Sequence, residues 1–113
     1  MLQYSEKQDD TILVLEITEQ RLEASNAPDL RDLLVGRIEA GNEQIVIDLR
    51  QVAFMDSSAL GALIGGIKKM RGLGTLVVSG ANGPVLQLLK LTRMDKVFPL
   101  YPSIDDALAD MKG

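Results

Sequence analysis

The sequence contains neither histidine nor cysteine. Without histidine the chain lacks the commonest general base near neutral pH, so a Ser-His-Asp triad is impossible. Without cysteine it has no disulfide, thiolate nucleophile or zinc finger, which fits a reducing compartment. The acidic pairs Asp9-Asp10 and Asp105-Asp106 have no third ligand near them in sequence that would indicate a metal site. We therefore expect a binding protein and not an enzyme, with no cofactor and no bound metal.

Long apolar runs and a basic charge balance are also lacking. Every hydrophobic run is far too short to cross a bilayer, and the first residues carry no signal-peptide pattern. We therefore expect a cytoplasmic protein without membrane insertion. The net charge of −4 argues against a nucleic-acid partner, because phosphates require a basic face. The one basic cluster, Lys68-Lys69-Met70-Arg71, ends a predicted helix, where cations interact favourably with the helix dipole.

Aromatic residues are scarce, so the core must be aliphatic. The chain has 113 residues, of which 46% are hydrophobic, and this is enough for one domain with one sizeable core. We expect a single domain that spans residues 1–113.

Runs typical of buried strands alternate with helical spacing along the chain. We expect strands at Gln3–Gln8, Thr11–Ile17, Gln44–Leu49, Thr75–Ser79 and Lys96–Phe98. We expect helices from Ser25 or Asn26 to just before Gly41, and at Ser57–Arg71, Val85–Leu91 and Ser103–Met111, with Thr18–Ser25 irregular. The first two strands should form a hairpin, and the strands around the central helix a right-handed parallel crossover. The predicted fold is α/β: a mixed four- to five-stranded sheet with a parallel centre and about four helices packed on it.

The stretch Met55-Asp56-Ser57-Ser58-Ala59-Leu60-Gly61 lies where a buried strand leads into the central helix. Asp and Ser side chains cap helices because their oxygens accept the unpaired N–H groups of the first turn. We expect Asp56 to cap the helix or orient Ser57, and Ser58 to be a second cap or a hydrogen-bonding neighbour. The other interpretation is that a hydroxyl is presented to a partner or a modifying enzyme. Functional groups in open α/β sheets tend to lie just beyond the carboxyl ends of the parallel strands.

Around this motif, Phe54 and Met55 are expected in the core, or, for Met55, at the apolar rim of a docking face. The helix that follows buries an apolar stripe, formed by Leu60, Leu63, Ile64, Ile67 and Met70.

Three glycines lie inside the predicted central helix, each at a cost of about 1 kcal/mol relative to Ala. They are Gly61, Gly65 and Gly66. Ser57, Gly61 and Gly65 are spaced four apart and therefore share a stripe beside the apolar one. The glycines have two interpretations. They allow close packing on the sheet or on a neighbouring helix, or they form a docking strip poor in side chains. Spacing alone somewhat favours close packing.

The motif and its surroundings resemble the STAS domain, and within it the bacterial anti-sigma factor antagonists. The resemblance covers most of the chain, carried by Ile45–Leu49, Phe54–Gly61, the Gly72–Gly74 break, Leu76–Ser79 and Leu88–Phe98. It implies that Ser57 is phosphorylated by a partner that is both serine kinase and anti-sigma factor. The unmodified form would bind this partner, and the phosphorylated form would release it until a metal-dependent serine phosphatase restores the hydroxyl. The partner-binding residues implied are Asp56, Ser57, Ser58, Gly61 and Gly65.

Two positions depart from the family pattern. Ala59 stands where the family commonly has glycine, and Gln20-Arg21-Leu22-Glu23 stands where it commonly has Gly-x-Leu-Asp. Within the same fold, the alternative function is that of a regulatory subunit of a larger assembly, such as a lipid or anion transporter, without phosphate cycling.

A phosphate on Ser57 would add about −1.5 to −2 charges. We expect free N–H groups and the helix dipole to favour it by ~0.3–1 kcal/mol, while the Asp56 carboxylate repels it. Because neither effect dominates, the sequence predicts a switch that acts on the partner without refolding the domain.

Overall fold

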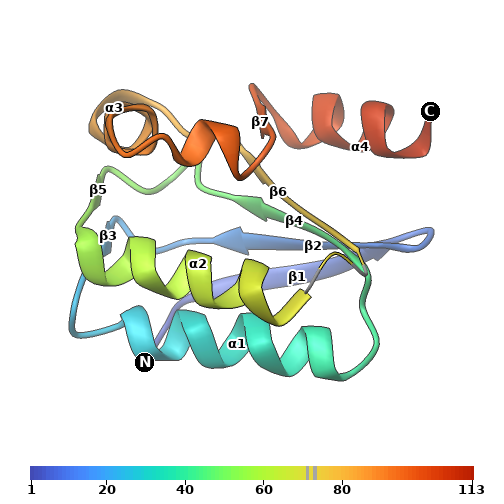
Figure 1. Cartoon of the computed structure of the whole chain (residues 1–113), viewed down its shortest axis with the longest axis horizontal. Helices are drawn as coiled ribbons and strands as arrows, with labels where there is room; N and C mark the ends of the chain where they lie inside the picture. Colours follow the sequence, from blue (N-terminus) through green and yellow to red (C-terminus); the bar gives the residue numbers. More distant parts are fainter. Residues whose placement is uncertain (71, 73) are drawn as a thin grey trace.

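A five-stranded mixed sheet forms the centre of the computed structural model, which describes residues 1–70, 72 and 74–113. The strand order is β1-β2-β4-β6-β7 (Figure 1). The first two strands are antiparallel and the other neighbours are parallel. This arrangement confirms the predicted mixed sheet with a parallel centre. The strands are β1 (Tyr4–Asp9), β2 (Ile12–Ile17), β4 (Gln44–Asp48), β6 (Thr75–Ser79) and β7 (Leu100–Tyr101).

Four α-helices pack on the sheet within residues 1–70, 72 and 74–113, in agreement with the predicted number of about four. They are α1 (Ala27–Glu39), α2 (Ser57–Met70), α3 (Gly83–Leu91) and α4 (Ile104–Lys112). Figure 1 shows α1 and α2 side by side on one face of the sheet and α4 on the other. The larger core lies under α1, α2 and α3, and a smaller cluster joins α4 to Val14, Val46 and Val77. The buried runs of β4 and β6 are covered on both faces, which explains their uninterrupted apolar sequence.

The helix ends agree in part with the sequence. Ser103 caps α4, because its hydroxyl accepts a hydrogen bond from the Asp106 N–H at 3.1 Å. Asn26 lies at the cap position of α1 but does not cap it; its side chain instead accepts from the Glu23 N–H and donates to the Arg21 carbonyl. Gly41, just past α1, has the positive φ of +104° expected there.

Gly74, just before β6, lies beside Glu43, just before β4. A Cβ at Gly74 would lie 2.1 Å from the Glu43 carbonyl oxygen, so only glycine permits this approach. Within the basic cluster at the end of α2, Lys69 has a structural role, because it forms an ion pair with Glu39 at 3.1 Å. Arg71, the predicted end of the helix, and Leu73 lie outside the described residues.

Two predictions about strands were wrong. The segment Thr18–Ser25 is not wholly irregular, because β3 (Arg21–Leu22) pairs in parallel with β5 (Phe54–Met55) in a separate two-stranded sheet. The predicted strand Lys96–Phe98 is not extended: a 3-10 helix, η1 (Met94–Lys96), is followed by a bond from the Phe98 N–H to the Met94 carbonyl.

The edge strand lies two residues later, at β7. Pro99 has no N–H, but its carbonyl accepts from the Val78 N–H at 3.0 Å, and this bond starts the pairing with β6. Phe98 is fully buried, as an apolar residue of either a strand or a turn could be. In the part of the chain that the structure describes, the helices are all too short or too polar to cross a bilayer.

Candidate functional site

The start of α2 is held by the small β3–β5 sheet. Leu22 pairs with Met55, and the Leu22 carbonyl accepts a hydrogen bond from the Asp56 N–H at 3.1 Å. Leu22 and Met55 are buried, so the predicted core position of Met55 is confirmed. Phe54, also predicted in the core, is only half-buried, and the Arg21 guanidinium lies over its ring, 4.2 Å from the centroid. The backbone that leads to Ser57 is therefore fixed by hydrogen bonds and packing on both sides.

Asp56 is the cap of α2, which is the first of the two roles expected of it. One oxygen, Oδ1, accepts from the Ser58 N–H at 2.9 Å and from the Ala59 N–H at 3.1 Å. A carboxylate in this position satisfies two of the orphan donors of the first turn and interacts favourably with the helix dipole. The expectation that these N–H groups would be free for a phosphate was wrong, since Asp56 already occupies two of them.

Ser57 and Ser58 both lie at the surface. Ser57 is the first residue of α2, and neither hydroxyl is hydrogen-bonded to any of the residues that the structure describes. Of the two roles expected of Ser58, the second cap was wrong, whereas the role of hydrogen-bonding neighbour is confirmed, because its N–H donates to Asp56. Ser57 is oriented through its backbone and its hydroxyl is accessible.

The three glycines of α2 divide between the two interpretations. A Cβ at Gly66 would lie 3.0 Å from Leu34 Cδ1 and 3.4 Å from Leu76 Cδ2, which is close packing against α1 and β6. Gly61 is exposed, and a Cβ there would have nothing within 4 Å. Gly65 lies under the side chain of Arg31, whose Nε would be 3.1 Å from a Cβ. Of the two glycines predicted to bind a partner, Gly61 is open and Gly65 is covered by a charged side chain.

A groove of about 300 Å³ separates α1 and α2 beside the motif. Its walls are largely apolar and one cation, Arg31, lies at its rim. Sequence reasoning missed the contribution of α1, because nothing in the spacing of either helix says which faces meet. The lining residues are Ala24, Ala27, Pro28, Arg31, Ser58, Gly61 and Ala62.

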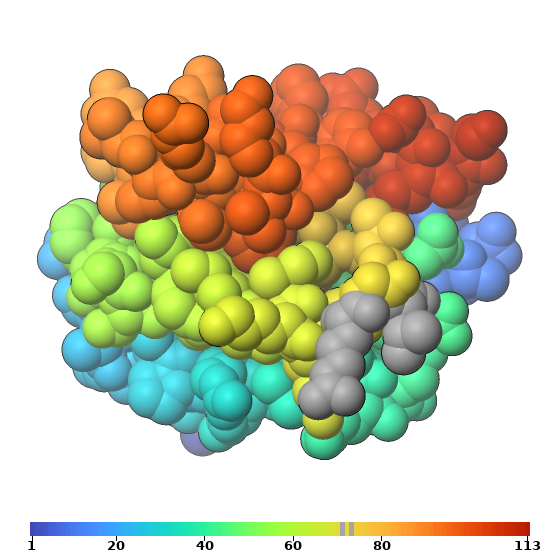
Figure 2. Space-filling view, in the orientation of Figure 1, coloured from blue at the N-terminus to red at the C-terminus, as the bar shows by residue number. Residues whose placement is uncertain are grey.

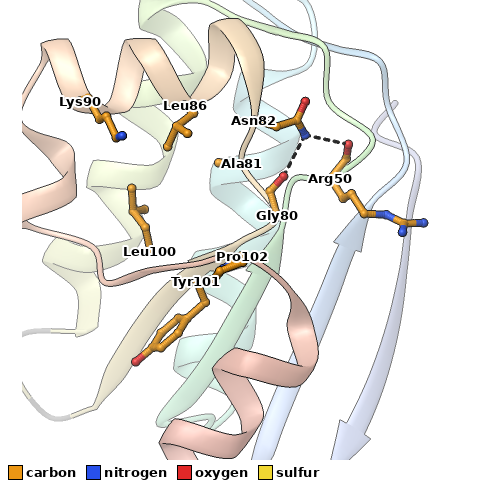
Figure 3. Close-up of a pocket in the computed structure, with 9 residues that line it drawn as sticks. All are labelled: Arg50, Gly80, Ala81, Asn82, Leu86, Lys90, Leu100, Tyr101 and Pro102. Atoms are coloured by element: carbon orange, nitrogen blue, oxygen red, sulfur yellow. Dashed lines mark hydrogen bonds between the residues drawn. The ribbon is translucent and has the colours of Figure 1, made fainter.

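A second cavity, of about 520 Å³, lies away from the motif near the carboxyl ends of β4, β6 and β7 (Figure 3). Leu86, Leu100 and the Lys90 side chain face one another there, while the Arg50 guanidinium points away. Asn82 closes one wall by donating to the carbonyls of Gly80 and Arg50. None of the predicted site residues lines this cavity, so it is separate from the site at α2.

The acidic residues of the described chain are spread out rather than gathered around a common point. Across residues 1–70, 72 and 74–113, no three carboxylates come together as a metal ion would require. The described site therefore offers hydroxyls, a capping carboxylate, a bare helix surface and an arginine. These groups suit recognition and modification.

Comparison with known proteins gives the family. The family model described as the STAS domain matches residues 3–107. The chain belongs to the STAS domain family. This confirms the resemblance that the sequence showed around Asp56 and Ser57.

Similar proteins of this family include anti-sigma factor antagonists. The anti-sigma F factor antagonist of Paenibacillus polymyxa is 35% identical over 71 residues, which are 62% of this chain and 61% of that relative. The crystal structure of an anti-sigma factor antagonist from Mycobacterium paratuberculosis has 26% identity and a TM-score of 0.91, covering 100% of this STAS domain and 96% of that chain. A sulfate transporter family protein from Wolinella succinogenes shares the fold at 22% identity and a TM-score of 0.78, covering 92% and 87% of the two chains.

Proposed function

We propose that this STAS domain is an anti-sigma factor antagonist whose binding is switched by phosphorylation of Ser57. The unmodified domain binds an anti-sigma factor that is also a serine kinase, and the phosphorylated domain releases it. The similarity to anti-sigma factor antagonists of two bacteria supports this function. The domain itself catalyses nothing in this scheme, and the kinase and a serine phosphatase supply the chemistry.

The observation that carries this function is the division of tasks at the start of α2. Asp56 caps the helix, so the hydroxyl of Ser57 is not needed for stability and lies at the surface. A serine that capped the helix would lose its hydrogen bond on modification. Ser57 can be esterified while the cap stays in place, which is what a reversible switch in a folded domain requires.

The modification itself is a phosphoryl transfer. The Ser57 oxygen attacks the γ-phosphorus of ATP, its proton passes to a base of the kinase, and ADP leaves. The phosphatase later cleaves the phosphorus–oxygen bond with water, which restores the hydroxyl and releases inorganic phosphate. Neither step needs a base or a metal from this chain, which fits its lack of histidine and cysteine.

Release of the partner follows from burial of the new charge. The predicted contact surface comprises Asp56, Ser57, Ser58, Gly61 and Gly65. Its exposed members Ser57, Ser58 and Gly61 have small side chains or none, which allows a close approach. A phosphate placed there adds bulk and about two negative charges. Leaving such a charge unpaired in an interface costs several kcal/mol, so we expect phosphorylation to weaken binding by about 100-fold or more.

Mass spectrometry tests the modification. The domain is incubated with ATP and each of the candidate serine kinases of the same genome. We expect a mass gain of about 80 Da, one phosphate, that Ser57→Ala abolishes and Ser58→Ala keeps. Titration of the same kinase should then give similar affinities for the unmodified domain and Ser57→Ala, and a much weaker one for Ser57→Asp. Modification of Ser58 alone, or tight binding by Ser57→Asp, would contradict this function.

The alternative function is that of a regulatory domain of a transporter assembly. It is supported by the fold that this chain shares with the sulfate transporter family protein. That function needs no phosphate cycle. Affinity capture from extract with the Ser57→Ala and Ser57→Asp variants discriminates the two functions. A kinase captured by Ser57→Ala but not by Ser57→Asp supports the antagonist. A transporter captured equally by both variants supports the alternative.

A further inference from the structure

Arg31 lies on the surface of α1 beside the motif. Its stem crosses α2 at Gly65, where Cγ and Cδ would each lie 3.5 Å from a Cβ and Nε 3.1 Å from it. It also lines the groove that contains Ser58 and Gly61. The side chain thus lies against a bare part of the helix surface, about two turns from the start of α2.

Arg31 is an exposed residue of α1. Among the residues that the structure describes, ion pairs engage Arg21 and Arg37 but not Arg31. An exposed arginine without a partner keeps its rotamer freedom, because no hydrogen bond restrains the guanidinium. Arg31 can therefore change its position at little cost.

A phosphate on Ser57 would need a cation that the helix start does not provide. The Ser58 and Ala59 N–H groups already donate to Asp56, whose carboxylate would also repel the new anion. Guanidinium groups bind phosphate oxygens through paired hydrogen bonds in a fixed geometry. The charge balance at the motif thus favours the approach of a nearby arginine.

Between Gly65 and Ser57 the surface of α2 is bare at Gly61. Gly65, Gly61 and Ser57 follow one another at intervals of four residues, about 6 Å of helix rise each, and a Cβ at Gly61 would meet nothing within 4 Å. Helices α1 and α2 run in the same direction (Figure 1), and helical side chains lean toward the N-terminus of their helix. The natural lean of Arg31 is therefore toward the end of α2 that carries Ser57.

We infer that Arg31 is the phosphate-binding residue of the switch: on phosphorylation of Ser57 its guanidinium leaves Gly65, passes over Gly61 and pairs with the phosphate. This role rests on the proposed modification of Ser57. The movement also changes the rim of the α1–α2 groove, so the partner meets a different surface as well as a new charge. Figure 2 shows α1 and α2 adjoining at the surface along this side of the molecule.

Phosphorus NMR tests the contact without any kinase. Phosphoserine is installed at position 57 of the full chain by amber suppression, and the second pKa of the phosphate, ordinarily about 6, is measured by titration. A neighbouring guanidinium lowers the pKa of an acid by up to about 1–3 units, less when solvent screens it. We expect the pKa to rise by roughly 0.3–1 unit in Arg31→Gln relative to the unsubstituted phosphoprotein.

Two further variants separate a contact from a diffuse charge effect. Gly61→Val keeps both charges but places a branched side chain on the route, and should raise the pKa of the phosphate as Arg31→Gln does. Arg21→Gln removes another exposed arginine, which is engaged with Glu23 and Phe54, and should change this pKa by much less. Asp56 is present in every variant, so its repulsion cancels from the comparison.

Equal pKa values with and without Arg31, or equal shifts in Arg21→Gln and Arg31→Gln, would overturn the role of Arg31. Because the phosphate is introduced without a kinase, these results do not depend on whether a kinase for Ser57 exists. Failure of the mass-spectrometry test would instead count against the proposed function alone. Circular dichroism of each variant checks that the domain is folded, as expected for substitutions at exposed positions.

Discussion

Helices α2 and α4 both begin with serine and aspartate, but they use them in opposite ways. At α4 the serine is the cap: Ser103 accepts from the Asp106 N–H, and its hydroxyl donates to the Asp106 carboxylate at 3.1 Å. At α2 the aspartate is the cap, and Ser57 and Ser58 are left with exposed hydroxyls. The same residue types thus give a closed, purely structural helix start in one place and an open one in the other. The difference is which residue accepts the N–H groups of the first turn. Where an aspartate accepts them, the neighbouring serine hydroxyl is not needed as a cap and is available for modification.

The largest stability effect within this comparison is expected at Asp56. Asp56→Ala removes the acceptor of two N–H groups, so we expect a loss of about 1–2 kcal/mol in the free energy of unfolding. For a domain of this size the melting temperature should fall by roughly 4–8 °C. Thermal unfolding followed by circular dichroism measures the change.

Asp56→Asn is the matched control, because asparagine caps helices about as well as aspartate. It should keep most of the stability while removing the charge beside Ser57. If Asp56→Ala is as stable as the unsubstituted protein, the assignment of capping to Asp56 does not hold.

A smaller difference is expected between the two serines. Ser103→Ala removes a cap and should cost about 0.5–1 kcal/mol, whereas Ser57→Ala removes an exposed hydroxyl and should stay within about 0.5 kcal/mol of the unsubstituted protein. Urea unfolding of the two variants under one set of conditions gives both values. A loss at Ser57→Ala as large as that at Ser103→Ala would mean that Ser57 also supports the helix.

The contrast between the helix starts could be predicted only in part from the sequence. Residue types alone placed caps at Asp56 and Ser103, because Asp and Ser are strong caps wherever a helix begins. They did not exclude a second cap at Ser58, since both serines and the aspartate precede the same first turn. The choice depends on the backbone entering the helix, which the pairing of Leu22 with Met55 fixes from a distant segment.

The fold could also be predicted only in part from the sequence. Long runs such as β4 and β6 and the apolar stripe of α2 were predicted, because each carries several residues of one periodicity. The two-residue strand β3 was missed, since Leu22 is its only apolar residue and two residues show no period. The position of Arg31 across Gly65 was beyond prediction, because it depends on how α1 and α2 pair.

The smallest expected effect on stability concerns Glu6, a carboxylate that belongs to neither helix start. Arg37 donates to Glu6 at 3.0 Å, and this hydrogen bond holds the pKa of Glu6 below its ordinary value of 4.5. Because the pKa is lower in the folded state, the stabilisation is complete above about pH 4.5 and is lost as the pH falls through the folded-state pKa.

Glu6→Gln should therefore flatten the fall of stability below pH 4.5, while leaving the caps of α2 and α4 intact. Both side chains of the pair are about one-third exposed, so solvent screening keeps the effect small. Asp56→Asn serves as the control that should leave the Glu6 contribution in place. Denaturant unfolding at several acidic pH values measures all three proteins, and an unchanged slope in Glu6→Gln would show that the ion pair with Arg37 does not persist in solution.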